Sequence, residues 1–129
     1  MHALIVLAHP EEGSFSAALA RTAADALAQA GWTVDLDDLV REGFVGGLTR
    51  ADLAPVPADD LVQIMWAQED ATARGGYAPA VLDQMRRLQA ADLVVTVFPF
   101  WWFGPPGTLK DWIDRVWANG VAYGHEAYD

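Results

Sequence analysis

The sequence has no cysteine, and its acidic residues outnumber its basic residues more than twofold. Without cysteine the chain can form no disulfide, no thiolate metal site and no cysteine nucleophile. Its 8 Lys and Arg residues against 18 Asp and Glu residues give a formal net charge of −10. Because this charge repels phosphate backbones and anionic lipids, we expect neither a nucleic acid nor a membrane surface as a partner.

Long apolar runs are also missing from the sequence. The N-terminal run Ala3–Ala8 is shorter than a signal peptide core or a membrane span, and no basic segment precedes it. We therefore expect no integral membrane segment and a cytoplasmic location. No repeat or linker divides the 129 residues, and a hydrophobic content of 53% suffices for one core. A single domain over residues 1–129 is predicted.

The hydrophobic pattern predicts alternating strands and helices. Strands are expected at residues 3–8, 33–37 and 93–98, and helices at 15–30, 79–88 and 109–117. The first and last strands are continuously apolar, which is typical of a parallel sheet, whereas residues 33–37 alternate as an edge strand does. This order predicts an α/β fold with a parallel sheet between two helical layers, a three-layer α/β/α sandwich.

The sequence leaves two parts of this predicted fold undetermined. Residues 38–78 have a weak pattern with several Gly and Pro residues, and only one short helix is expected there, at residues 59–67. The strand at residues 93–98 is as apolar as a central strand, which has neighbours on both edges. Either further strands lie outside this chain or a partner covers that edge.

The loop after the first strand contains the first group of candidate binding residues. In parallel α/β sheets ligands bind beyond the carboxyl ends of the strands. His9, Ser14 and Ser16 lie there, at the start of a helix whose N–H groups attract phosphate. Neither the GxGxxG nor the GxxxxGK[ST] pattern is present. The alternative interpretation is that Ser14 only caps the helix and that His9 is a capping or packing residue.

The loop after the last strand contains the second group, Pro99–Gly104. Four consecutive aromatic residues, Phe100–Phe103, are too large to be hidden at one turn of a small domain, and an exposed apolar patch marks a binding surface. A flat heteroaromatic ring would stack there and accept hydrogen bonds from backbone N–H groups near Gly104. A flavin meets this description, with its phosphates at the first loop. The alternative is an oligomer interface, where aromatic residues are also enriched. No residue spacing matches a metal site, so no metal is expected.

These stretches resemble the NAD(P)H:quinone oxidoreductase (DT-diaphorase-like) family of flavodoxin-like flavoproteins. The resemblance is carried by Leu4–Pro10 with Ser14–Ser16, by Gly43-Phe44 and Thr49–Asp52, and above all by FPFWWFGPPGTLKDWIDRV at Phe98–Val116. It extends from Ala3 to Tyr123. The fold that it implies is the flavodoxin-like α/β/α sandwich.

The resemblance also implies an activity and a set of site residues. NAD(P)H would reduce a noncovalent FAD, or FMN in its place, and a quinone or similar acceptor would then reoxidise it in a ping-pong cycle. His9, Phe15 and Ser16 would hold the pyrophosphate and adenosine side, and Phe100–Phe103 would frame the isoalloxazine ring. Tyr123, the expected catalytic residue, would face the nicotinamide or quinone together with Ala122 and Gly124. The resemblance further implies a homodimer.

Family members are longer than this chain. They contain two more strands, a Thr-Gly-Gly loop against the flavin and a downstream Tyr/His pair. The sequence ends at Asp129, so we expect about three of five strands and an incomplete domain. The alternative function is a catalytically silent flavodoxin-like domain that docks to another protein. Colour discriminates the two, because only the reductase would be a yellow protein that bleaches with NAD(P)H.

Overall fold

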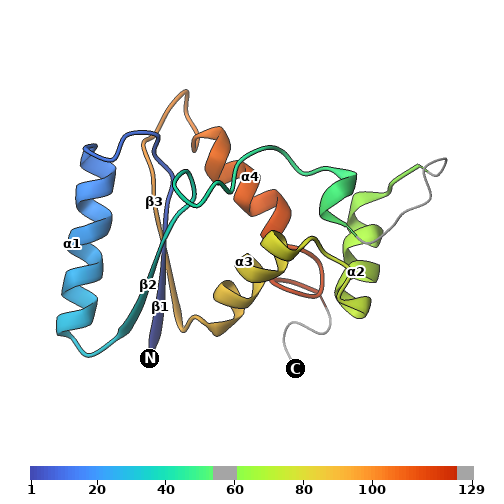
Figure 1. The fold of residues 1–129 in the computed structure, drawn as a ribbon, viewed down its shortest axis with the longest axis horizontal. Helices are drawn as coiled ribbons and strands as arrows, with labels where there is room; N and C mark the ends of the chain where they lie inside the picture. Colours follow the sequence, from blue (N-terminus) through green and yellow to red (C-terminus); the bar gives the residue numbers. More distant parts are fainter. Residues whose placement is uncertain (54–60, 125–129) are drawn as a thin grey trace. The chain divides into compact units, whose positions relative to one another are not determined.

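The computed structural model describes residues 1–53 and 61–124, which belong to two compact units. The first unit comprises Met1–Gly46 and Ala90–Trp112, and the second comprises Gly47–Gln89 and Ile113–Asp129. In chain order the elements are β1 (His2–Leu7), α1 (Phe15–Gln29), β2 (Thr33–Asp38), the 3-10 helix η1 (Arg50–Asp52), α2 (Ile64–Arg74), α3 (Pro79–Ala90), β3 (Leu93–Val97) and α4 (Gly107–Val116) (Figure 1). The single domain over residues 1–129 stays a prediction.

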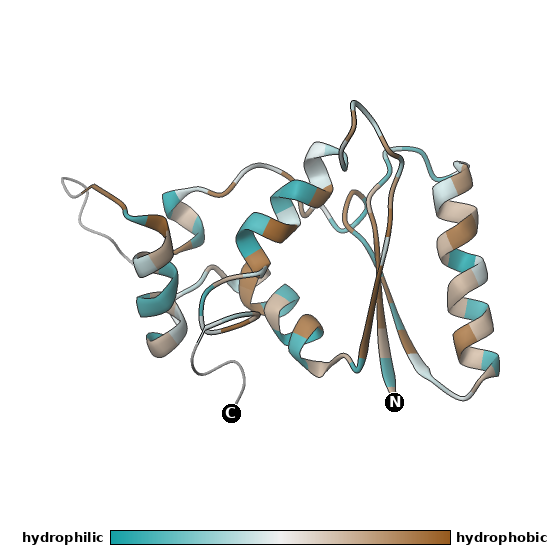
Figure 2. Ribbon diagram, turned by 180° about the vertical axis from the view of Figure 1, so that it is seen from behind, coloured by the Kyte–Doolittle hydropathy of each residue, from teal (hydrophilic) through white to brown (hydrophobic). Residues whose placement is uncertain are grey.

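The first unit is built on a parallel three-stranded sheet with the strand order β2-β1-β3. The central strand β1 is the apolar N-terminal run, and Ala3–Val6 are completely buried. The register pairs Ile5 with Leu36 on one side and with Val95 on the other. Strand β2 lies at an edge, as its alternating sequence predicted. Figure 2 shows hydrophobic residues concentrated along the strands.

Helix α1 packs against this sheet through its small residues. Ala17 and Ala20 contact a buried cluster that also contains Ile5, Leu7 and Val97. The helix begins where Ser14, in extended conformation, accepts a hydrogen bond at Oγ from the Ala17 N–H at 3.1 Å. Ser14 is therefore an N-cap residue, and this hydrogen bond satisfies one of the amides at the start of the helix.

Strand β3 lies at the other edge of the sheet. Among the described residues it pairs with β1 alone, and Thr96 is exposed while Leu93–Val95 are half-buried. Whether further strands or a partner cover its second edge, the two alternatives that the sequence left open, stays a prediction. Its apolar sequence still fits a strand whose second edge is covered by other residues.

The second unit contains the weakly patterned part of the chain. The helix expected at residues 59–67 is wrong in position: α2 begins at Ile64 and continues to Arg74, and residues 59 and 60 lie outside the described residues. The buried residues of α2 are Gln68 and Ala71, whereas Ile64 is exposed. The apolar pattern therefore placed the helix too early. The helix ends at Gly75, whose left-handed φ of 66° is a common helix terminus.

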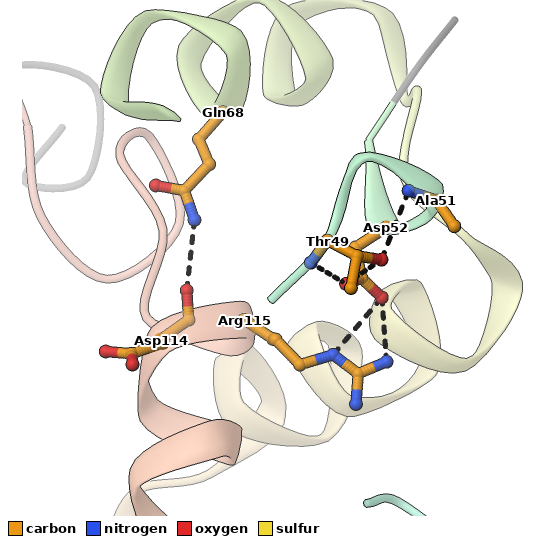
Figure 3. Close-up of polar contacts among 6 residues, drawn as sticks. All are labelled: Thr49, Ala51, Asp52, Gln68, Asp114 and Arg115. Carbon is orange, nitrogen blue, oxygen red and sulfur yellow. Dashed lines mark hydrogen bonds and ion pairs between the residues drawn. The ribbon is translucent and has the colours of Figure 1, made fainter. Parts of the chain in front are cut away.

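Two long-range polar contacts connect the elements of the second unit (Figure 3). The Asp52 carboxylate accepts hydrogen bonds at Oδ1 from Arg115 Nη2 at 2.7 Å and Nε at 3.2 Å, and at Oδ2 from the Thr49 N–H at 2.8 Å. Gln68 Nε2 donates to the Asp114 carbonyl at 3.1 Å. The Arg115 and Asp52 side chains are only 11% and 7% exposed, so this ion pair is buried.

Candidate functional site

The loops after β1 and β3 leave the sheet at the same end, where the carboxyl ends of the parallel strands lie (Figure 1). Leu7 and Val97 are register partners, and the Ala8 N–H continues the pairing by donating to the Val97 carbonyl at 3.0 Å. The first unit therefore holds every residue that the sequence analysis assigned to the cofactor: His9, Ser14–Ser16 and Pro99–Gly104. Parallel α/β proteins bind their ligands at this carboxyl end of the sheet.

His9 has a fixed orientation in the first loop. Its Nδ1 accepts a hydrogen bond from the Glu11 N–H at 2.9 Å, so the neutral imidazole carries its proton on Nε2. Its ring also makes an edge-to-face contact with Trp101, with ring centroids 5.8 Å apart. These two contacts connect the first loop to the aromatic segment and leave Nε2–H as a hydrogen-bond donor.

The start of α1 presents polar groups next to His9 in the sequence. Ser14 uses an oxygen lone pair as the helix cap and keeps its hydroxyl proton for donation. Phe15 is exposed, and Ser16 is half-buried in the first turn. The amides of a first helical turn have no acceptor within the helix, and they favour a negatively charged group. A phosphate is compatible with this arrangement.

The aromatic segment forms a tight turn with an unusual backbone. Trp101 and Gly104 exchange two N–H to carbonyl hydrogen bonds of 3.0 Å each, and the residues between them have φ angles of 47° at Trp102 and 63° at Phe103. Two positive φ angles are typical of a type I′ turn, where Asn and Gly are preferred. Bulky side chains in this region carry a cost of about 1–2 kcal/mol each.

The strained turn holds its side chains in solvent. Trp102 is 96% exposed and Phe103 is 91% exposed, and Phe100 and Trp101 are also exposed. These rings are therefore not part of the core, and they form a contiguous apolar surface of the kind that marks a binding site. A stacked planar ligand and a subunit interface both remain compatible with this surface.

One expectation about this turn changes. The Gly104 N–H donates to the Trp101 carbonyl within the turn, so it is not available to a bound ring. The amides of Trp102 and Phe103 have no acceptor within residues 1–53 and 61–124. They are the donors that a planar heterocycle would use at this site.

Phe103→Gly is expected to stabilise the protein by about 1 kcal/mol, because glycine adopts positive φ without steric cost. Chemical denaturation would measure the change in the free energy of unfolding. Phe100→Gly is the matched control, since Phe100 is an exposed aromatic residue without a positive φ. Equal effects of the two substitutions would contradict a strained turn.

The residues predicted to face the substrate lie in the second unit. Ala122, Tyr123 and Gly124 belong to a turn that follows α4, in which the Gly120 N–H donates to the Tyr123 carbonyl at 2.7 Å. Tyr123 and Gly124 line a cavity of about 460 Å³, and Ala122 does not line it. The other lining residues are Glu69, Thr72, Ala73, Asn119 and Gly120. A cavity of this size accommodates a small organic ligand.

The sequence analysis missed the residues of α2 that line this cavity. Glu69 and Thr72 are separated from Tyr123 by about fifty positions and belong to no recognised motif. Their polar pattern predicts a solvated helix face, and only folding places them beside the turn. No signal in the sequence alone would have selected them.

Residues 1–53 and 61–124 contain no cluster of three or more His, Asp or Glu side chains suited to a metal ion. Of the helices in the same ranges, none combines the length and apolar character that a membrane crossing requires.

The chain matches the family model of the flavodoxin-like fold over residues 1–129. It is 39% identical to the rat NAD(P)H dehydrogenase [quinone] 1 over 123 residues, which is 94% of this chain and 44% of that protein. A Klebsiella pneumoniae structure superimposes with a TM-score of 0.85 at 34% identity, covering 92% of this chain and 46% of the other. The NAD(P)H:quinone oxidoreductase of Methanothermobacter marburgensis has a TM-score of 0.71 at 33% identity, covering 98% and 58%.

The chain belongs to the flavodoxin-like fold family, and its relatives include NAD(P)H:quinone oxidoreductases, as the resemblance predicted. The fold class, a flavodoxin-like α/β/α sandwich with a parallel sheet, is confirmed. The chain spans about half the length of the curated relatives it matches.

Proposed function

We propose that this chain forms the flavin-binding part of a two-electron oxidoreductase that passes a hydride from NAD(P)H through a noncovalent FAD to a quinone or similar acceptor in a ping-pong cycle. The observation that carries the proposal is the turn at Trp102 and Phe103. Its backbone is strained, it exposes two aromatic rings, and it lies at the carboxyl edge of the sheet. Strained residues that remain exposed are typical of a binding function.

The residues of the first unit fit a flavin nucleotide. A planar ring system would stack on the exposed rings and accept hydrogen bonds from the Trp102 and Phe103 amides. The pyrophosphate would accept hydrogen bonds from His9 Nε2–H, from the Ser14 and Ser16 hydroxyls and from the first amides of α1. No side chain at this site has to act as a strong acid or base. When bound, the flavin supplies the hydride acceptor and donor.

The residues of the second unit fit the substrate side of the proposed reaction. The Tyr123 ring would face the nicotinamide or the quinone, with Ala122 and Gly124 beside it, and its hydroxyl would donate a hydrogen bond to a quinone oxygen. Glu69 and Asn119 line the same cavity and supply further polar groups. The resemblance also supports a homodimer, in which the exposed aromatic rings would contribute to an interface. Cytoplasmic location and the absence of a nucleic-acid partner stay predictions.

Cofactor binding is the first test. The purified chain is titrated with FAD and, separately, with FMN, and flavin fluorescence and absorbance report the two dissociation constants. The proposal expects a yellow complex and a stronger binding of FAD. A colourless protein at micromolar concentrations of both flavins would instead favour the silent partner domain.

The second test separates the two half-reactions. NADH or NADPH is added to the flavin complex without oxygen, and the loss of flavin absorbance is recorded. A quinone is then added, and the absorbance is expected to return. Bleaching that no quinone reverses would contradict the proposed acceptor while leaving the flavin site intact.

Sedimentation velocity on the same sample tests the homodimer.

A further inference from the structure

Thr72 and Gly120 interlock in the second unit. Thr72 lies in the last part of α2, and Gly120 lies in the turn that ends at Gly124. A Cβ atom added to Gly120 would lie 2.8 Å from the Cγ2 methyl of Thr72, and Gly120 has a φ of +80°. Any side chain at this position would therefore collide with Thr72 and strain the backbone.

The Thr72 hydroxyl makes a second connection to the same turn. Its Oγ1 donates to the Asn119 carbonyl at 2.8 Å and also lies 2.9 Å from the carbonyl of Gln68 in its own helix. The Tyr77 hydroxyl, 3.0 Å from Thr72 Oγ1, donates to the Gln68 carbonyl at 2.7 Å. The Gln68 carbonyl therefore has a second hydroxyl donor in Tyr77, while the Thr72 hydroxyl also reaches the Asn119 carbonyl in the turn.

Tyr123 lies in the same hydrogen-bonded turn as Asn119 and Gly120. The Gly120 N–H donates to the Tyr123 carbonyl at 2.7 Å, which closes the turn directly after the residue that Thr72 holds. Gly124 lies against the same turn, since an added Cβ would lie 3.2 Å from the Gly120 backbone nitrogen and close to the Asn119 side-chain oxygen. The cavity beside Tyr123 is lined by Thr72, Asn119 and Gly120 themselves. The turn and α2 are therefore in direct contact and line the same cavity.

The electrostatic surroundings agree with this proximity. Burial raises the pKa of Tyr77, its hydrogen bond with Thr72 opposes this shift, and the nearby Tyr123 hydroxyl adds to it. Thr72 thus contacts the buried Tyr77 and lines the same cavity as Tyr123.

We propose that Thr72 is a positioning residue, whose hydroxyl holds the Asn119–Gly124 turn so that Tyr123 faces the cavity. The effect of Thr72 on the reaction rests on the proposed function, in which Tyr123 is the residue expected to contact the nicotinamide or quinone. The Thr72 hydroxyl holds the turn by its hydrogen bond to the Asn119 carbonyl, and the Thr72 methyl leaves no room for a side chain at Gly120.

Two substitutions separate the hydroxyl from the methyl group. Thr72→Val keeps the shape and removes the hydroxyl, whereas Thr72→Ser keeps the hydroxyl and removes the methyl. The matched control is Thr22→Val in the first unit, because Thr22 Oγ1 makes the same type of bond within a helix, 3.0 Å from the Ala18 carbonyl. All variants are made in the full chain, and circular dichroism checks that each is folded.

The primary readout needs no cofactor. The chain has three tyrosines, so incorporation of 3-fluorotyrosine yields three fluorine NMR signals, which Tyr→Phe variants assign. Thr72→Val is expected to shift the Tyr123 signal and to accelerate hydrogen exchange of the Gly120 amide by roughly tenfold. Thr72→Ser and Thr22→Val are expected to leave both unchanged. An unchanged Tyr123 signal in Thr72→Val, or an equal change in Thr72→Ser, would overturn the proposal.

A second pair of variants tests the close approach. Gly120→Ala is expected to displace the Tyr123 signal, and the double variant Gly120→Ala/Thr72→Ser should restore part of the shift, because serine lacks the methyl that collides. No restoration would contradict the interlock. Should Gly120→Ala fail to fold, the Thr72 variants alone decide.

Steady-state kinetics connects the positioning role to the reaction. Thr72→Val is expected to lower kcat/KM for the quinone roughly tenfold while the dissociation constant of the flavin is unchanged. If the wild-type chain reduces no quinone but the Tyr123 signal still moves only in Thr72→Val, the proposed function fails and the positioning stands. If the quinone is reduced but the signal does not move, the positioning fails and the proposed function stands.

Discussion

Replacing Trp102 by alanine is expected to weaken flavin binding by about 1–3 kcal/mol, roughly a 5- to 150-fold rise in the dissociation constant. The reason is the loss of a large ring that the structure holds almost fully in solvent, at 96% exposure, where it is free to cover a planar ligand. The dissociation constants of both proteins are measured by flavin fluorescence, at a temperature well below unfolding.

The matched control for this substitution is Trp32→Ala. Trp32 precedes β2, so it lies at the amino-terminal end of the parallel strands, opposite to the edge with the aromatic turn. Its loss should leave the flavin dissociation constant unchanged. Equal affinities of Trp102→Ala and the wild type would remove Trp102 from the cofactor site and favour its role in a subunit interface.

Replacing Asp52 by asparagine is expected to lower the free energy of unfolding by about 3 kcal/mol. The Asp52 carboxylate receives hydrogen bonds from Arg115 at one oxygen and from Thr49 at the other, and both members of the ion pair are nearly inaccessible to water. Asparagine removes the charge and presents an N–H group where an acceptor is needed. Urea unfolding measures the difference.

Asp70→Asn provides the control for this prediction. Asp70 also forms an ion pair with an arginine, Arg74, but their side chains are 49% and 70% exposed. Exposed pairs contribute about 0.5 kcal/mol, so the loss should be several times smaller than for Asp52→Asn. Similar losses in the two variants would show that burial of the Asp52–Arg115 pair does not determine its contribution.

This ion pair assigns a structural role to part of the motif that carries the family resemblance. Arg115 lies in the motif at Phe98–Val116, and Asp52 lies in the separate stretch Thr49–Asp52. Both stretches resembled the family, but nothing in the sequence indicated that they contact each other. The structure shows that they do, through a buried ion pair within the second unit (Figure 3).

The aromatic turn has opposite requirements for stability and for binding. A glycine at Phe103 would relieve the left-handed backbone, yet it would remove one of the two rings that the turn displays. Asn-Gly, the usual choice for such a turn, is absent here. The strain is compatible with selection for a surface that binds.

Most of the fold was predictable from the sequence because its signals are local. The continuous apolar run at β1, the alternation at β2 and the helical spacing in α1, α3 and α4 each depend on residues a few positions apart. Helix α2 was misplaced because its buried positions are Gln68 and Ala71, which carry little apolar signal. Strand β3 was predicted as a strand, but its edge position depends on which strands pair with it.

The candidate site was predictable in composition and not in geometry. The sequence by itself determined which segments follow the strands and that one of them is rich in aromatic residues, because order and residue type are properties of the chain. The exposure of the aromatic residues was also expected from the sequence. Only the tertiary structure decided that Trp102 and Phe103 adopt positive φ angles, that Asp52 meets Arg115 and that Thr72 meets Gly120. These features depend on backbone angles and on contacts between residues far apart in the chain, which hydrophobic spacing does not encode.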